Sequence, residues 1–76
     1  MQLTLEQADA FLAGEAIEGV RFQLNEEVEI VEGAHRGTFG SVIAIESLGA
    51  DPILVVELST GLDLKVAQSC LSSARA

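Results

Sequence analysis

Residues 24–45 read LNEEVEIVEGAHRGTFGSVIAI, and this stretch decides the fold. Apolar residues alternate with glutamates before its glycines, which is the period of a strand with one buried face. Gly33 permits the positive φ with which the chain leaves that strand, and Gly37 permits the return turn. Gly40 falls inside the next strand, where a missing side chain permits a sharp bend and a close backbone approach. We predict two antiparallel strands bent tightly around these glycines.

The downstream sequence continues the pattern of short strands and tight turns. Turn signals rich in Gly, Asp, Pro and Ser separate runs of β-branched and aliphatic residues. We expect strands at 27–32, 39–46, 53–58 and 62–66, and a 3₁₀ turn within 67–71. Closing such strands into a barrel removes their exposed edges. The sequence therefore predicts a mainly β fold, a small antiparallel barrel of four to five strands over residues 24–71.

A short helix is expected before the barrel, over residues 5–13. Thr4 and Gln7 have the spacing of a capping box, in which each side chain bonds to the backbone N–H of the other residue. Apolar residues recur along the helix at three- and four-residue spacing, namely Leu5, Ala8, Phe11 and Leu12. A helix this short is marginal alone, so this apolar stripe needs a surface to dock on.

The chain divides into three parts on this pattern. Residues 1–23 are the N-terminal helix and its connector, and residues 24–71 are the barrel. Within the connector, residues 20–24 alternate in polarity and predict either a short strand or an extended lead-in. Residues 72–76 are expected to be a frayed tail.

The three glycines carry a resemblance to a known family. Val28 and Ile30, the spacing Gly33-x-x-x-Gly37-x-x-Gly40 and the following Val42 resemble the KOW motif of SH3-like barrels in bacterial transcription factors and ribosomal proteins. The later Val55–Leu58 run, with Gly61, Val66 and Leu71, is similar to the downstream strands of such barrels. The resemblance, over residues 24–71, implies an SH3-like fold and a role with RNA or ribosomes.

Composition argues against that role. The chain has 76 residues, with 12 acidic against 4 basic residues and a net charge of −8, so polyanions such as RNA and anionic lipid are repelled. Around the glycines lie Glu26, Glu27, Glu29 and Glu32, against Arg36 alone, and Thr38 stands where the family often has lysine. The chain lacks Trp and Tyr for stacking on bases. No signal peptide or membrane span is visible, so we expect a cytoplasmic protein without membrane contact.

The candidate site residues are few. His35 and Arg36 form the tip of the first turn, as an interaction tip that donates to carboxylates or phosphates, or as a plain solvated turn. One histidine and one cysteine do not make a metal cluster, and we expect no metal or cofactor. No catalytic motif is present, so we expect no enzyme activity. Cys70 is expected to be a small, half-buried core residue.

Three hypotheses about function follow. The first is a small acidic, non-enzymatic protein-interaction module with another protein as its partner, and the negative charge favours a basic one. The acidic run is then either a docking face or the solvated side of a strand. The second is an RNA- or ribosome-associated KOW-type protein, with Arg21, Arg36, Lys65 and Arg75 as its cations. The third is a self-associating structural protein, joined through Leu48, Ile53 and Leu54 or through the helix stripe.

Overall fold

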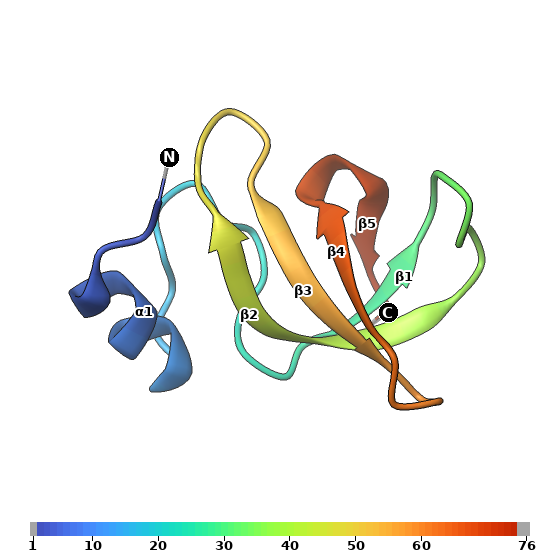
Figure 1. Cartoon of the computed structure of the whole chain (residues 1–76), viewed down its shortest axis with the longest axis horizontal. Coiled ribbons are helices and arrows are strands. Elements are labelled where there is room, and N and C mark those ends of the chain that lie inside the picture. The colour runs from blue at the N-terminus through green and yellow to red at the C-terminus, as the bar shows by residue number, and fades with distance from the viewer. Residues whose placement is uncertain (1, 75–76) are drawn as a thin grey trace.

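Five antiparallel strands form one sheet in the order β4-β3-β2-β1-β5, preceded by one helix (Figure 1). The structure is a computed structural model and describes residues 2–74. The elements are α1 (Leu5–Leu12), β1 (Glu27–Ile30), β2 (Phe39–Ser47), β3 (Ile53–Leu58), β4 (Asp63–Ala67), the 3₁₀ helix η1 (Gln68–Cys70) and β5 (Leu71–Ser73). The Cα radius of gyration of 11.5 Å agrees with about 11 Å expected for a compact chain of this length.

The turn between β1 and β2 is built as the glycines predict. Gly33 and Gly37 have φ of 99° and 91°, a region that side chains with a Cβ rarely adopt. The Gly37 N–H donates to the carbonyl of Ile30 at 2.7 Å and closes the turn. The first strand was expected to reach residue 32 and ends instead at Ile30, because the chain turns away there.

The strand β2 is long and bent, and Gly40 marks the point of closest approach to its neighbour. A Cβ at Gly40 would lie 2.7 Å from the Glu57 carbonyl oxygen and 2.7 Å from the Val56 side chain. The predicted close approach is confirmed. Two register shifts against β3, between Val42 and Ala44 and between Ile45 and Ser47, add to the irregularity of this pairing.

The N-terminal segment shares one core with the strands. The buried apolar residues are Phe11, Ile17, Val20, Phe22, Val28, Ile30, Val42, Leu54, Val56, Leu58 and Leu71, and four of these eleven precede residue 24. Residues 20–24 form the extended lead-in rather than a strand, because no strand pairs with them. The helix and connector are therefore part of the same packed unit as the sheet.

Arg21 and Gln68 fasten the connector to η1. The backbone N–H of Arg21 donates to Gln68 Oε1 at 2.8 Å, and Gln68 Nε2 donates to the backbone carbonyl of Gly19 at 3.2 Å. Arg21 Nη2 donates in return to the carbonyls of Gln68 and Leu71, at 3.0 and 3.4 Å. Gln68 is buried, so these bonds satisfy both ends of its amide.

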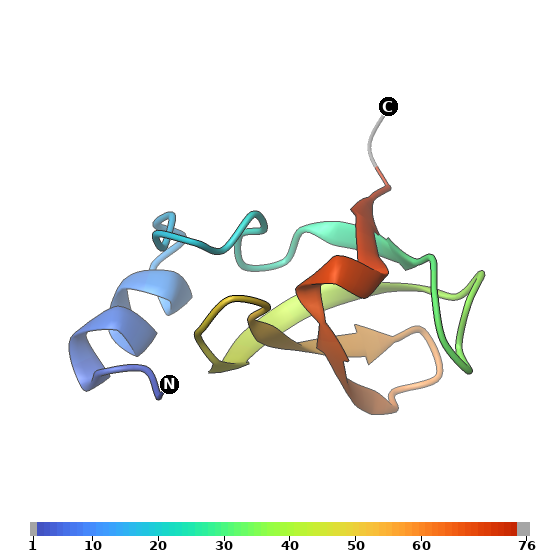
Figure 2. The same cartoon turned by 90° about the horizontal axis from the view of Figure 1, so that it is seen from above.

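The end of the chain corrects one prediction. Ser72 and Ser73 were expected to fray, but they belong to β5 and pair with β1. The second edge of β1 is open after β2 has taken the first, and β5 fills it. The Ala74 backbone N–H donates to the Glu27 carbonyl at 3.0 Å, and Arg75 and Ala76 lie outside the described residues. Figure 2 shows how the chain returns from β4 through η1 to β5. Within residues 2–74 no ladder joins β4 to β5.

Candidate interaction surface

The helix α1 forms as its sequence predicts and leaves part of its apolar stripe uncovered. The Gln7 N–H donates to Thr4 Oγ1 at 3.1 Å and the Thr4 N–H donates to Gln7 Oε1 at 2.9 Å, which completes the capping box. The helix packs against β2 and buries Phe11. Leu5 and Leu12 remain 80% and 57% exposed. The stripe is therefore only partly docked.

A narrow apolar groove separates α1 from β2. It is lined by Leu3, Ala8, Phe11, Leu12, Ala44 and Ile45, and its volume is about 80 Å³. We call it the α1–β2 groove. Its walls are almost wholly apolar carbon, and Leu12 and the neighbouring Leu5 extend the apolar surface beyond the rim. Such a hollow can hold an aliphatic group but offers no chemistry for a reaction.

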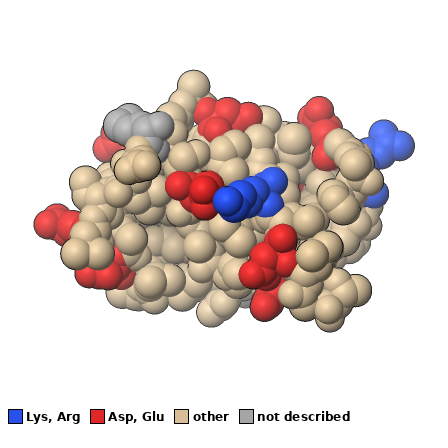
Figure 3. Space-filling view, viewed as in Figure 1, with Lys and Arg blue, Asp and Glu red and all other residues tan. Residues whose placement is uncertain are grey.

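Acidic side chains dominate the part of the molecule that carries α1. Among residues 2–24 the acidic residues are Glu6, Asp9, Glu15 and Glu18, and the single basic residue is Arg21. The guanidinium of Arg21 bonds to backbone carbonyls and lies 5.1 Å from the centre of the Phe22 ring. On the face viewed in Figure 3, basic side chains lie at the middle and at the end away from α1. This distribution leaves the surroundings of α1 negative.

The predicted tip at His35 and Arg36 is exposed at the turn between β1 and β2. Phe39, at the start of β2, is half exposed nearby in sequence. No ion pair is found at His35 or Arg36 among the described residues. The two residues are therefore exposed at one turn, and no charged side chain pairs with them among the described residues.

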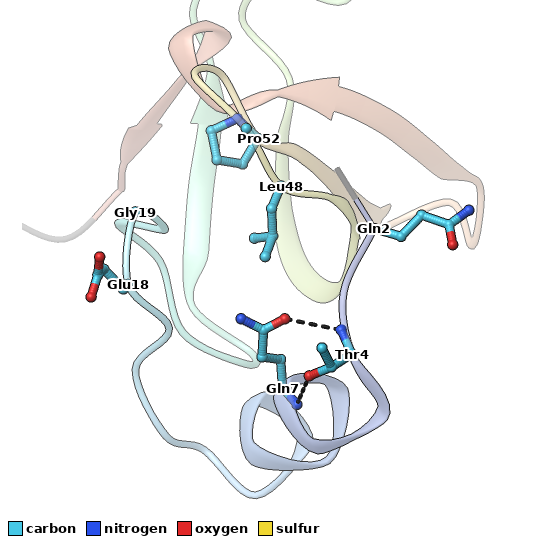
Figure 4. Close-up of a pocket in the computed structure, with 8 residues that line it drawn as sticks. Gln2, Thr4, Gln7, Glu18, Gly19, Leu48 and Pro52 are labelled. Atoms are coloured by element: carbon cyan, nitrogen blue, oxygen red, sulfur yellow. Dashed lines mark hydrogen bonds between the residues drawn. The ribbon is translucent and has the colours of Figure 1, made fainter.

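A second hollow, of about 470 Å³, lies between the start of α1 and the loop before β3 (Figure 4). Its lining includes Thr4 and Gln7, whose bonds to each other are the dashed lines in Figure 4. Leu48 and Pro52 close it on the side of the loop. Thr4 Oγ1 and Gln7 Oε1 both accept bonds of the capping box. These two side chains therefore have a structural role at the start of α1.

The loop before β3 is tied to η1 through Asp51. Asp51 Oδ2 accepts from the Ser69 hydroxyl at 2.6 Å and Oδ1 accepts from the Ser69 N–H at 2.9 Å. The bond from the Ser69 hydroxyl is the largest cause that holds the pKa of Asp51 below its usual range, and the bond from the Ser69 N–H is the next largest. The positive charge of Arg21 lowers this pKa by a smaller amount. These two bonds hold the loop before β3 against Ser69 of η1.

The other residues considered as candidates in the sequence lie on different elements and do not form one site. Glu27 and Glu29 lie on the face of β1 opposite the buried Val28 and Ile30, as the alternation predicts. Cys70 is half-buried, as expected. Of the residues proposed for self-association, Leu54 is fully buried and is wrong as a contact residue. Within residues 2–74 no group of three His, Cys, Asp or Glu side chains is placed to hold a metal ion, and no helix is long and apolar enough to cross a membrane.

No protein-family model, no curated protein and no solved structure matches this chain.

Sequence reasoning found the stripe of α1 and missed the groove beside it. The stripe follows from spacing along one helix, whereas the groove depends on where α1 meets the end of β2. Ala44 and Ile45 read as ordinary strand residues in the sequence, and their place opposite Ala8 is a long-range contact that no local pattern indicates. Gln68 was likewise overlooked, because its partners Gly19 and Arg21 lie almost fifty residues away.

Proposed function

We propose that this protein is a non-enzymatic protein-interaction module on an SH3-like barrel, and that its partner is a basic protein. The observation that carries the proposal is the exposed apolar surface of α1 in an acidic setting. Large apolar side chains that gather beside a groove are typical of interaction sites, and the net charge of −8 favours encounter with a cationic partner.

Three features support the barrel. The strand order β4-β3-β2-β1-β5, the 3₁₀ helix between the last two strands, and the long bent β2 together fit the SH3-like arrangement that the KOW-like glycines suggest. Leu64 and Val66 of β4 pack against the same core as Leu71 of β5. A sheet whose two end strands share one core is curled around it, which brings its edges toward each other.

The positions of the cations favour a protein over a nucleic acid as partner. Lys65 pairs with Glu46 at 3.3 Å, and the Arg21 guanidinium bonds to carbonyls of η1 and β5. Arg36 is left at an exposed tip, and Arg75 lies outside the described residues. Nucleic-acid binding depends on several cations that neutralise phosphates together, and two of the three described cations are already engaged within the protein.

The test is capture from a lysate of the source organism, with and without ribonuclease, followed by reconstitution. Proteins retained after ribonuclease treatment are purified, and their binding to the full chain is measured by calorimetry at low and high salt. We expect a basic protein that binds directly and more weakly at high salt. Loss of all capture after ribonuclease treatment, or failure of every purified protein to bind, would overturn the proposal.

A further inference from the structure

We propose that the α1–β2 groove seats one aliphatic side chain of a cationic amphipathic helix in the partner, which lies along α1 against Leu5 and Leu12. This inference rests on the proposed function and adds the place and the chemistry of the contact. It is carried by three properties of the described residues: the spacing of the exposed leucines, the size of the groove, and the charge on its rim.

The exposed apolar residues of α1 form a line. Leu5, Ala8 and Leu12 follow one another at three- and four-residue spacing, so they lie on one side of the helix. Leu5 and Leu12 are seven residues apart, which is about 10 Å along a helix axis. A partner helix with the same spacing can set its apolar ridge beside this line over two turns.

The groove limits what can enter it. Its volume of about 80 Å³ is roughly the space of two to three water-sized groups, at about 30 Å³ each. The groove is therefore closer in size to one branched aliphatic side chain than to an aromatic ring system. Leu12 and Ala8 form one wall and Ala44 and Ile45 form the other, so an entering side chain would touch apolar carbon on both sides.

Charge selects the remainder of the partner. Asp9 lies between Leu5 and Leu12 in the helical spacing, and Glu6 lies next to it on the solvent side. Neither residue has a basic partner among the described ion pairs. Lysine or arginine flanking the aliphatic anchor would meet these carboxylates. A second copy of this chain fits poorly here, because two chains of charge −8 repel each other.

The probe is a synthetic amphipathic helix of Leu, Ala and Lys, labelled with a fluorophore, together with a counterpart in which Glu replaces Lys. Binding to the full chain is followed by fluorescence anisotropy. The test variant is Leu5→Gln with Leu12→Gln, since glutamine retains helix propensity. The matched control is Leu62→Gln, a side chain 54% exposed between β3 and β4. Circular dichroism establishes that the variants fold.

We expect the cationic helix to bind the native chain, the double variant to bind it about tenfold more weakly, and the control to stay within about twofold. The anionic helix should not bind. If the cationic helix binds the double variant as tightly as the native chain, the place proposed here is wrong and the proposed function still stands. If it does not bind the native chain, the inference fails, and the proposed function is then decided by the capture and reconstitution experiment alone. Dimerisation of the native chain that the double variant abolishes would assign the groove to a second copy and overturn the inference.

Discussion

Gly40 shows how one residue sets the shape of this sheet. The position a Cβ would take lies 2.7 Å from the backbone carbonyl oxygen of Glu57, and backbone cannot swing aside as the end of a long side chain can. The bend of β2 therefore depends on the absence of a side chain here. This is also the residue at which the sequence pattern was most informative, because a glycine within a strand is unfavourable unless close approach requires it.

We predict that Gly40→Ala lowers the free energy of unfolding by about 1–3 kcal/mol, as overpacking does elsewhere. The measurement is urea denaturation followed by circular dichroism. The control is Ser41→Ala, the next residue of β2, which is expected to change stability by less than about 0.5 kcal/mol. Equal stability of Gly40→Ala and the native chain would contradict the close packing of β2 against β3.

Asp51 gives a prediction about pH. Its pKa is lowered in the folded chain by the two bonds from Ser69, so the folded state favours the carboxylate more than the unfolded state does. Its contribution to stability is therefore complete above the unfolded pKa and is lost as the pH falls through the folded pKa. We expect the stability difference between the native chain and Asp51→Ala to be constant at neutral pH and to shrink below about pH 5.

Thermal unfolding of both proteins between neutral and acid pH measures this difference. Asp63→Ala removes another exposed carboxylate, at the start of β4, and serves as the matched control; it should change the melting temperature little. A gap between Asp51→Ala and the native chain that widens in acid would show that the bonds to Ser69 do not favour the charged form.

Among the helix and strands, periodicity in the sequence predicts where each element lies. It does not predict which strands pair with one another. The predicted strand at 53–58 agrees with β3, and the bounds of the other three agree within one residue, except that β1 ends two residues before the predicted end. Residues 20–24 alternate as a strand would, yet among the described residues no strand pairs with them. Ser72 and Ser73 have a weak pattern, yet they form β5 because β1 has an open edge. In both places long-range pairing outweighs local preference.

The contact of Gln68 with the connector joins two such distant elements. Gln68→Ala would leave the Arg21 N–H and the Gly19 carbonyl without their bonds. We predict a loss of about 2 kcal/mol in the free energy of unfolding, the usual penalty for an unsatisfied buried polar group. The exposed Gln23, which donates to the Gly14 carbonyl at 3.3 Å, is the control.

Urea denaturation measures the free energy of unfolding of Gln68→Ala and of Gln23→Ala. Both variants replace glutamine by alanine, so only the position differs. Gln23→Ala should lie within about 0.5 kcal/mol of the native chain. If the two variants are equally stable, Gln68 does not hold the connector, and the connector would have to be held by its apolar residues alone.

At the scale of the whole molecule, helix, connector and sheet behave as one unit. The sequence pattern divides the chain at residue 24, where the alternation of strand residues begins. The buried core does not follow that division, since it includes residues on both sides of it. Phe11, Ile17, Val20 and Phe22 belong to the same buried cluster as the strands. Small domains bury little surface in total, so the loss of four buried side chains removes a large share of the stabilising area.

We predict that residues 24–76 expressed alone do not fold cooperatively, whereas the full chain does. Thermal unfolding followed by circular dichroism distinguishes the two, since a cooperative transition requires a single packed core. The double variant Leu5→Gln and Leu12→Gln is the control, because it changes the helix only at exposed positions and should retain a cooperative transition. A sharp transition in the truncated chain would mean that the strands form an independent domain.

We propose that the exposed side of α1 and the adjacent end of β2 form the contact surface for a basic partner. A nuclear magnetic resonance titration of the isotope-labelled full chain with the cationic amphipathic helix tests this most directly. We expect the largest chemical-shift changes on α1 and on Ala44 and Ile45. Changes confined to the turn at His35 and Arg36, or spread evenly over the acidic surface, would contradict it.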